Sequence, residues 1–281
     1  MSGILYVCAT PIGNLEDITF RVIRVLQEVD LIAAEDTRNS IKLLNHYEIK
    51  TPMTSYHEYN KIEKAHYLIQ QLAAGMQVAL ITDAGTPAIS DPGEELVALC
   101  YEAGITVTSL PGPSASVTAL TLAGLPTRRF TFEGFLPVDK KARRKIVSAL
   151  TQETRTMIVY EAPHRLLRTL EDLLESMGNR RATLCRELTK KFETVLPLTL
   201  EELYETYKGT EIKGECILVI EGRSEQEIAE ESFQKWEKLS VQEHMAYYEQ
   251  QGISTKEAMK LVAKDRGVGK RDIYRKLLED K

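Results

Sequence analysis

The sequence has little of several features that mark other classes of protein. Its four cysteines show neither a Cys-x-x-Cys pair nor a Cys/His spacing, which argues against a zinc site or a disulfide framework, so we expect buried free thiols. No apolar run reaches the roughly 18 residues that a membrane span needs. No basic leader precedes the first apolar stretch, so we expect a cytoplasmic protein that is neither secreted nor inserted into a membrane.

A strong net charge is also absent. The 281 residues carry a net charge of -5, which argues against a protein that coats nucleic acid by bulk charge but leaves room for a local basic patch. The chain has no Gly-x-x-x-x-Gly-Lys-Ser/Thr loop and no Gly-x-Gly-x-x-Gly fingerprint. These absences argue against ATP or NAD held in the common ways.

What the chain does have is an alternation of short β-rich runs with helical stretches. From residue 3 to about 122 this rhythm predicts a mainly parallel sheet with helices on its faces. A second set of apolar runs predicts a second α/β lobe; the runs are residues 130–132, 157–160, 182–185 and 216–220. We therefore predict an α/β fold with two lobes, residues 1–122 and 123–224.

The composition changes after residue 223. Residues 225–249 are strongly acidic, whereas residues 255–281 are rich in lysine and arginine, so we predict a small all-helical domain at 225–281. Residues 254–277 predict two amphipathic helices around a glycine-containing turn, as in a helix-turn-helix. The predicted inward positions are Ala263, Gly267 and Ile273.

This C-terminal module has two interpretations. Its basic residues concentrate on and beyond the turn, which favours nucleic-acid contact, and the predicted RNA contacts are Lys270, Arg271 and Arg275. The alternative is a helical hairpin that packs on the body or on a partner chain.

Three loops at the ends of predicted strands pair glycine with proline: residues 9–15, 83–93 and 111–116. Open α/β sheets bind ligands at the carboxyl ends of their strands. Glycine lets the main chain approach a ligand, and proline makes the approach rigid. Any one loop is equally well explained as a tight turn. Three in one lobe favour a site that presents backbone groups to a polar small molecule.

Eight motifs together resemble the tetrapyrrole methylase superfamily of S-adenosylmethionine-dependent methyltransferases, over nearly the whole chain. The motifs are residues 10–15, 34–38, 83–87, 90–93, 111–115, 161–165, 186–190 and 214–215. Thr86 stands where the superfamily more often has aspartate, and in this the chain resembles the RNA-modifying branch. The resemblance implies methylation of a cytidine ribose 2′-oxygen in 16S ribosomal RNA.

The resemblance also implies that S-adenosylmethionine binds in a cleft between the two lobes. The implied cofactor contacts are Pro11, Asp83, Ala84, Gly85, Thr86, Ile89, Ser114, Ala115, Ser116, Tyr160, Leu188, Cys216 and Ile217. A homodimer is implied by the family alone. Methyl transfer of this kind needs no metal ion, and we predict none.

Transfer of a methyl group from a sulfonium to a ribose hydroxyl needs in-line alignment and removal of a proton from a weakly acidic oxygen. The candidates for a base, or for a cation that stabilises the alkoxide, are Asp36, Glu187 and Lys190, with Arg38 and Arg186 as electrostatic or phosphate partners. A second interpretation stays open, in which Asp36 or Thr37 caps the following helix and Arg38 pairs with Glu35.

Three other polar runs are candidates for RNA contact, each with a structural alternative. Residues 56–60 suit a splayed-out base or simply a helix start. The basic run 140–145 begins a helix, where cations oppose the helix dipole, so it is either a phosphate contact or a solvated face. Residues 163–165 lie at a predicted helix start. The predicted contacts are His57, Asn60, Lys140, Lys141, Arg143, Arg144 and Arg165.

The sequence therefore predicts a methyltransferase that acts on 16S ribosomal RNA or on the small ribosomal subunit. One rival is a methyltransferase of the same fold that acts on a tetrapyrrole or a protein side chain, for which the basic residues at 140–145 and 255–281 have no obvious use. The other rival is a non-catalytic RNA-binding or ribosome-assembly factor. Binding of S-adenosylmethionine separates this second rival from the enzymes.

Overall fold

Five short parallel strands form the first sheet. A computed structural model describes residues 2–224, 226–228, 236 and 239–279. The sheet has the order β3-β2-β4-β1-β5, and every pairing is parallel, which confirms the predicted parallel sheet. Its strands are β1 (Ile4–Cys8), β2 (Leu31–Ala34), β3 (Met53–Ser55), β4 (Val78–Ile81) and β5 (Thr106–Leu110).

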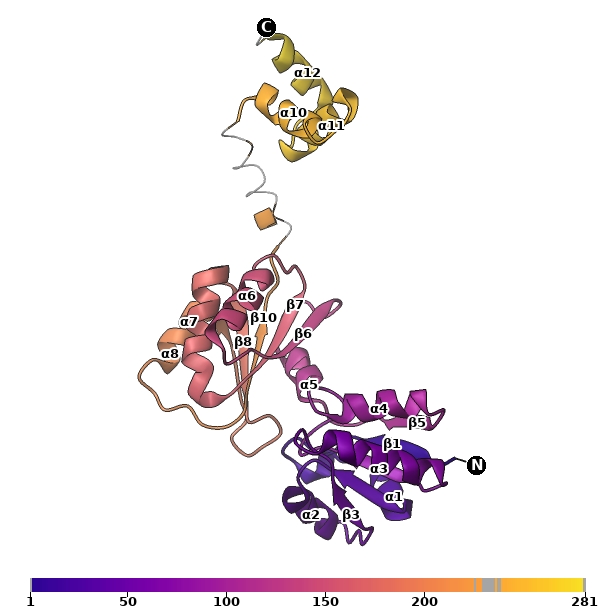
Figure 1. Cartoon of the computed structure of the whole chain (residues 1–281). Helices are drawn as coiled ribbons and strands as arrows, with labels where there is room; N and C mark the ends of the chain where they lie inside the picture. The colour runs from indigo at the N-terminus through magenta and orange to yellow at the C-terminus, as the bar shows by residue number, and fades with distance from the viewer. Residues whose placement is uncertain (1, 225, 229–235, 237–238, 280–281) are drawn as a thin grey trace. The chain divides into compact units, whose positions relative to one another are not determined.

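Helices cover both faces of this sheet (Figure 1). Val22 and Leu44, from α1 and α2, pack on one face, whereas Leu68 and Leu96, from α3 and α4, pack on the other. Because both faces are covered, β2 and β4 are buried along their whole length. The helices are η1 (Leu15–Asp17), α1 (Phe20–Glu28), α2 (Thr37–His46), α3 (Lys61–Ala73), α4 (Gly93–Glu102) and α5 (Ala115–Leu122).

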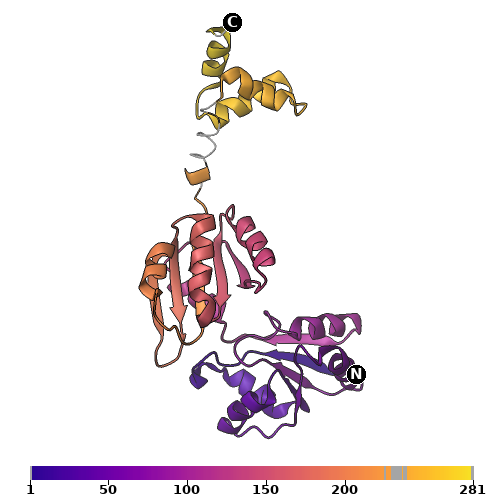
Figure 2. The same cartoon turned by 60° about the vertical axis from the view of Figure 1, so that its left-hand side comes forward.

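The second sheet is mixed, with the order β6-β7-β10-β8-β9. Only β6 and β7 pair in parallel, and the other pairings are antiparallel. Helices α6, α7 and α8 pack on one face of this sheet, which is turned toward the viewer in Figure 2. The elements are β6 (Phe130–Phe135), α6 (Lys140–Leu150), β7 (Thr156–Glu161), η2 (Pro163–Arg165), α7 (Leu166–Met177), β8 (Arg181–Arg186), β9 (Thr194–Thr199), α8 (Leu200–Tyr207) and β10 (Cys216–Ile220).

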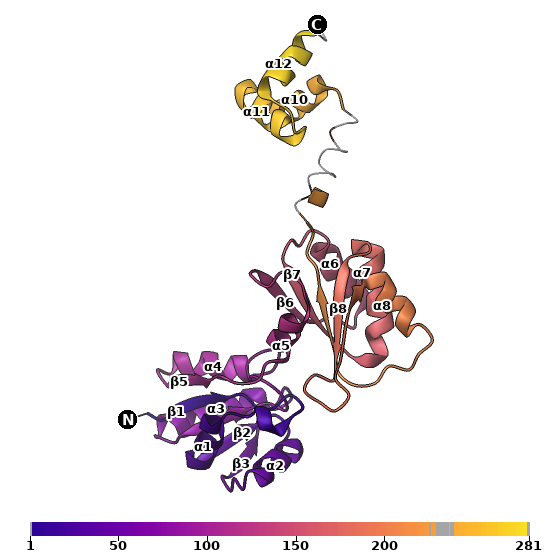
Figure 3. The same ribbon diagram turned by 180° about the vertical axis from the view of Figure 1, so that it is seen from behind.

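Helix α5 joins the two sheets. It follows the loop after β5, and its Ala119 and Leu120 are buried against Ile158 and Val219 on the second face of the second sheet. Figures 1 and 3 both show α5 between the sheets. One helix thus connects the carboxyl edge of the first sheet to the core of the second, and the predicted boundary after residue 122 falls at its end.

By their contacts, residues 1–150 and 156–221 form one compact unit, and residues 222–281 with 151–155 form another. The second unit contains α10 (Val241–Glu249), α11 (Thr255–Asp265) and α12 (Lys270–Glu279). The predicted helical C-terminal region is therefore confirmed, although residues 225, 229–235, 237–238 and 280–281 lie outside the described residues.

Two of the three predicted inward positions in this unit are correct. Ala263 and Ile273 are buried with Val262 in its small core. The prediction for Gly267 is wrong, because this residue is exposed in the turn and has a φ of 61°, a conformation that glycine adopts without strain.

All four cysteines are free and buried, as predicted: Cys8, Cys100, Cys185 and Cys216. Within the described residues, every helix is too short or too polar to traverse a bilayer.

Candidate active site

A cavity of about 490 Å³ lies where the carboxyl ends of the first sheet meet the second sheet. This volume is in the range of small-molecule sites, roughly 300 to 1,000 Å³. Its walls are Ile12, Glu35, Thr82, Asp83, Ala84, Gly85, Thr86, Ile89, Ser90, Asp91, Ser114 and Ala115 from the first sheet and α5, and Phe135, Tyr160, Glu161, Ala162, Pro163, Glu215, Cys216 and Ile217 from the second.

Most of the predicted cofactor contacts line this cavity: Asp83, Ala84, Gly85, Thr86, Ile89, Ser114, Ala115, Tyr160, Cys216 and Ile217. Three do not. Ile12 takes the place of Pro11 in the wall. Leu188 is buried in the core between the sheets, and Ser116 is buried with its hydroxyl 3.1 Å from that of Ser114.

Hydrogen bonds to backbone carbonyls tie the three glycine and proline loops together. The Thr10 and Gly85 backbones exchange two hydrogen bonds, at 2.9 and 3.0 Å. The Thr86 hydroxyl donates to the Pro113 carbonyl at 3.0 Å, which links the second loop to the third. Gly85 has a φ of 86°, in the left-handed region that favours glycine. The first sheet therefore presents a rigid main-chain surface to the cavity.

A strained segment forms one edge of the cavity. Ala88 and Ser90 have φ values of 67° and 64°, which non-glycine residues rarely adopt. The Asp91 carboxylate holds this segment by accepting hydrogen bonds from the backbone of Ala88, Ile89 and Gly93, at 2.9, 3.3 and 2.7 Å. Strain of this kind persists only where the surroundings fix it, and it gathers at ligand sites.

A second strained segment comes from the other sheet. Glu187 and Thr189 have φ values of 51° and 65°. The segment comes so close to Gly13 that a Cβ atom there would lie 2.5 Å from Cγ of Lys190 and 2.8 Å from the Leu188 carbonyl oxygen. Residue 13, in the loop after β1, must therefore be glycine. This close approach places residues 187–190 beside the cavity.

Asp36 and Arg38 form an ion pair at the end of β2. The Asp36 carboxylate accepts from the backbone of Arg38 at 2.8 Å, as the cap of α2, and from its guanidinium at 2.6 Å. These hydrogen bonds lower the pKa of Asp36 to about 2. Arg38 is 88% exposed and pairs with Asp36, not with Glu35 as the alternative interpretation had it. Neither residue lines the cavity.

Glu187 and Lys190 also pair, beside the cavity. The Lys190 ammonium lies 3.0 Å from the Glu187 carboxylate and 3.2 Å from that of Glu215, which lines the cavity. The backbone N–H of Glu215 is the main cause that lowers the pKa of Glu187. Burial acts to lower the pKa of Lys190, but its bonds to the two carboxylates outweigh this and raise it. Lys190 is therefore a cation and Glu187 an anion near neutral pH.

Asp83 differs from these carboxylates. Its pKa is raised, and the largest cause is partial burial of the carboxyl group, although the residue as a whole is exposed. The hydrogen bond from Asn39 acts to lower the pKa. The negative charges of Glu35 and Asp36 act to raise it further. Glu35 accepts from the Thr82 hydroxyl and, at 3.3 Å, from the Asp83 backbone. Within the described residues neither Asp83 nor Glu35 forms an ion pair.

Residues 4–204 match the family model described as Tetrapyrrole (Corrin/Porphyrin) Methylases. The chain belongs to this family. Curated relatives named "Ribosomal RNA small subunit methyltransferase I" resemble it over nearly its full length. One from Halalkalibacterium halodurans is 52% identical, and one from Bacillus subtilis is 47% identical, each over 97% of this chain and 93% of the relative. One from Escherichia coli O157:H7 is 44% identical over 99% of this chain and 95% of the relative.

Solved structures share the methylase fold. Uroporphyrin-III-C-methyltransferase from Thermus thermophilus is similar with a TM-score of 0.56 and 22% identity, over 77% of this chain and 94% of that one. Diphthine synthase is similar with a TM-score of 0.59 and 16% identity, over 78% of this chain and 90% of that one. The first enzyme has also been solved with S-adenyl homocysteine. The two sheets are therefore the methylase fold.

The cavity of this methylase suits an adenosyl ligand with a cationic sulfonium. Its described lining includes five carboxylates, on Glu35, Asp83, Asp91, Glu161 and Glu215, and neither lysine nor arginine. Glu161 and Glu215 are paired with cations outside this lining, whereas Glu35 and Asp83 form no ion pair within the described residues. Burial raises the pKa of the Cys216 thiol to about 11, so the thiol stays neutral. No group of histidine, cysteine and carboxylate side chains among the described residues is placed to hold a metal ion.

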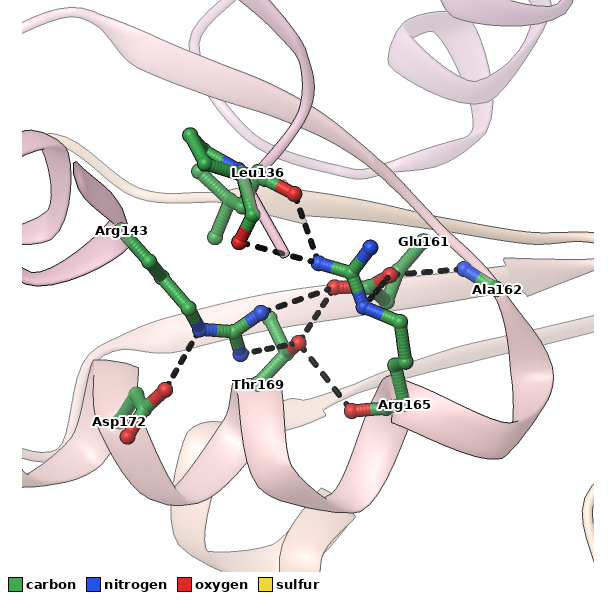
Figure 4. A network of polar contacts seen from close by, with 8 residues as sticks. Leu136, Arg143, Glu161, Ala162, Arg165, Thr169 and Asp172 are labelled. Atoms are coloured by element: carbon green, nitrogen blue, oxygen red, sulfur yellow. Dashed lines mark hydrogen bonds and ion pairs between the residues drawn. The ribbon is translucent and has the colours of Figure 1, made fainter. Parts of the chain in front are cut away.

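Two predicted RNA contacts of the methylase need correction, because their guanidinium groups are held by the buried Glu161 at the end of β7 and by neighbouring polar groups (Figure 4). Arg143 is 2% exposed, and it binds Asp172 at 2.6 Å and the Thr169 hydroxyl at 2.6 Å. Arg165 pairs with the buried Glu161 at 3.3 Å and donates to the Leu136 carbonyl at 2.6 Å. Neither guanidinium is presented to RNA phosphates.

The other predicted RNA contacts belong to separate elements of the chain. Lys140, Lys141 and Arg144 are exposed on α6, and Lys270, Arg271 and Arg275 are exposed on α12 of the other unit. Asn60 accepts from the His57 backbone at 2.8 Å and donates to the Ser55 hydroxyl at 3.1 Å, so its amide holds a turn.

Several wall residues were missed by the sequence reasoning. Glu35, Asp91 and Glu161 lie inside motifs that carried the family resemblance, so the signal was present but went unused. Phe135 lies outside every motif, and only the structure places it at the cavity.

Proposed function

We propose that this chain is an S-adenosylmethionine-dependent methyltransferase that methylates the 2′-oxygen of a cytidine ribose in 16S ribosomal RNA of the small ribosomal subunit. The observation that carries the proposal is near-full-length identity of 44 to 52% with proteins named ribosomal RNA small subunit methyltransferase I. The cytidine 2′-oxygen follows from the motif resemblance. An enzyme with this substrate works in the cytoplasm, where ribosomes are assembled.

The first sheet is suited to hold the methyl donor, which supplies an electrophilic methyl group when bound. The main-chain surface from Asp83 to Thr86 offers backbone groups, and Ser114 and Ala115 close one side at the start of α5. Tyr160 and Ile217 line the cavity from the second sheet, where they would cover the bound donor and exclude water. A rigid and enclosed site fixes the direction in which the methyl group leaves.

The charged pairs beside the cavity favour a cationic role over a basic one. A carboxylate with a pKa of about 2, such as Asp36, takes up a proton poorly near neutral pH. We infer that Lys190, which Glu187 and Glu215 keep protonated, stabilises the negative charge that develops on the 2′-oxygen. Arg38, with its guanidinium exposed, is suited to a neighbouring phosphate.

The exposed basic residues suit a second point of contact with RNA. We propose that Lys270, Arg271 and Arg275 on α12, and Lys140, Lys141 and Arg144 on α6, bind phosphates. A homodimer is a further proposal from the family resemblance, and light scattering of the purified chain tests it.

Two measurements test the proposed function. Calorimetry should show that the chain binds S-adenosylmethionine, and labelled methyl groups should pass to small subunits that lack the modification, on one cytidine ribose. Absence of donor binding would exclude an enzyme of this class. Donor binding without transfer to small subunits would favour the rival that methylates a tetrapyrrole or a protein side chain.

A further inference from the structure

The cavity has a buried inner part and an exposed rim. Gly85, Cys216 and Ile217 line the inner part and are buried. At the rim, the side chains of Ile89 and Phe135 are 51% and 58% exposed. A macromolecular substrate reaches the cavity from solvent, so the rim is the part that it meets.

The two sides of the rim come from different sheets and approach each other closely. Ile89 lies in the strained segment after β4, and Phe135 is the last residue of β6. A Cβ atom on Gly134 would lie 3.2 Å from the hydroxyl oxygen of Ser90. An aliphatic and an aromatic side chain therefore stand at neighbouring points of the same entrance.

The Phe135 ring is supported by an aromatic contact with Tyr160. Its centroid lies 5.6 Å from that of Tyr160, with the rings at 71°, and Phe132 supports Tyr160 in turn at 4.9 Å. Edge-to-face pairs of this kind are favourable, and they leave a face of the supported ring open.

Arg165 fixes the chain that follows Phe135 (Figure 4). One of its guanidinium nitrogens donates to the carbonyls of Leu136 and Pro137, at 2.6 and 3.5 Å. The guanidinium is itself fixed by the carboxylate of Glu161, whose side chain is fully buried. A buried carboxylate thus orients Arg165, and Arg165 orients the end of β6.

We propose that Phe135 is the platform on which the base of the target nucleotide stacks, and that Arg165 is the positioning residue that holds it there. The inference rests on the proposed function. For the 2′-oxygen to enter the cavity, the target nucleotide must leave the stack of its neighbours. An exposed aromatic ring replaces the stacking that the base loses, and it can do so for any base, because every base has a π-face. Ile89 offers the base an apolar edge on the other side.

Three variants of the full chain test the platform. Phe135→Ala removes the ring, Phe135→Trp keeps an aromatic face, and Phe20→Ala is a control at an aromatic residue that is 92% exposed and outside the cavity. The readouts are kcat/KM for unmodified small subunits at saturating donor, and the Kd for S-adenosylmethionine by calorimetry. Thermal unfolding checks that each variant is folded.

For Phe135→Ala we expect a loss of about 10- to 100-fold in kcat/KM, the effect of one base–aromatic stack, with the donor Kd unchanged within about twofold. Phe135→Trp should stay within about threefold of the wild type, and Phe20→Ala should match it. If Phe135→Ala weakened donor binding by the same factor, the ring would stack on the donor's adenine and the proposal would be wrong. It would be equally wrong if Phe135→Ala matched Phe20→Ala.

A double-mutant cycle tests the role of Arg165. Arg165→Met should lower kcat/KM for small subunits in the wild-type chain but have little further effect when Phe135 is already alanine, because the group that it positions is gone. Equal losses in both backgrounds would show that Arg165 does not act through Phe135, and its positioning role would be wrong. The wild-type chain separates the two proposals: if it transfers no methyl group to small subunits, the proposed function itself fails and takes this inference with it.

Discussion

The two sheets contribute to one cavity in different ways. The first offers backbone groups, together with carboxylates such as Glu35 and Asp83, in loops that backbone hydrogen bonds hold, such as those between Thr10 and Gly85. The second offers side chains, among them Phe135 and Tyr160, which aromatic contacts and a buried ion network hold. A main-chain wall depends on backbone conformation, whereas a side-chain wall depends on its partners. The two walls should therefore fail under different substitutions.

The largest effect should come from the second sheet, on stability. Glu161→Ala would leave Arg143 and Arg165 without their buried carboxylate, and we expect a loss of about 3 to 5 kcal/mol in the free energy of unfolding of the first unit. Urea unfolding measures it. Glu221→Ala is the control, since its partner Arg181 is 58% exposed and the loss there should be under about 1 kcal/mol. Similar losses at both sites would contradict the burial of the network.

In the first sheet, donor binding should be most sensitive to substitutions that change the backbone conformation of the loops. Gly85→Val forces a branched side chain onto a φ of 86°, and we expect the Kd for S-adenosylmethionine to rise about 100-fold because the loop must move. Calorimetry measures this. Gly104→Val is the matched control, since Gly104 has a φ of 67°, lies in open space and is outside the cavity. It should lower stability and leave the Kd unchanged; a similar rise in Kd at both glycines would refute a local effect.

A smaller effect should come from Lys190, whose substitution should change the rate of methyl transfer but not the affinity for the donor. Lys190→Ala removes the proposed cation, so we expect single-turnover methyl transfer to slow by about tenfold to thirtyfold with donor affinity retained. Lys190→Arg should recover most of the rate. Lys191→Ala, at the exposed neighbouring lysine, is the control. An unchanged rate in Lys190→Ala would leave positioning alone to account for catalysis.

The smallest effect should be a pH dependence of donor affinity. Because its pKa is raised above the ordinary value near 3.8, Asp83 takes up a proton at a higher pH than a free aspartate does. Asp83 therefore stabilises the folded protein more, relative to the unfolded chain, as the pH falls through that window. Over the same window the cavity loses one negative charge.

We expect affinity for the cationic donor to weaken by about twofold to fivefold over this window. Calorimetry from neutral to mildly acidic pH measures the trend. Asp83→Asn should bind the donor more weakly at neutral pH and show a flatter profile. An equally steep profile in this variant would assign the titration to another group.

The contrast between the sheets also explains how much the sequence could predict. Glycine and proline are visible signals of backbone conformation, so the loops of the first sheet were found. Two strands were missed. β3 has only three half-buried residues, and β9 contains Pro197, which an edge strand tolerates because its backbone nitrogen needs no partner there.

Side-chain roles in the second sheet were harder to predict, because they depend on partners distant in the sequence. Phe135 has no local pattern that separates it from a core phenylalanine. For Arg143 a signal did exist: it precedes the buried Val147 and Leu150 by four and seven residues, which places all three on the inward face of α6. The basic run around it hid this periodicity.

Helix α5 has a consequence for how such a chain can be altered. It begins in the wall of the cavity at Ala115, yet Ala119 and Leu120 are sealed beneath the other sheet. If either sheet were exchanged or expressed alone, Ala119 and Leu120 would lose the apolar residues that bury them. The matched family model covers the first sheet and the second sheet as far as α8, and it ends at residue 204, before β10. The curated relatives match over 97 to 99% of this chain, so the match takes in both sheets and most of the C-terminal unit together.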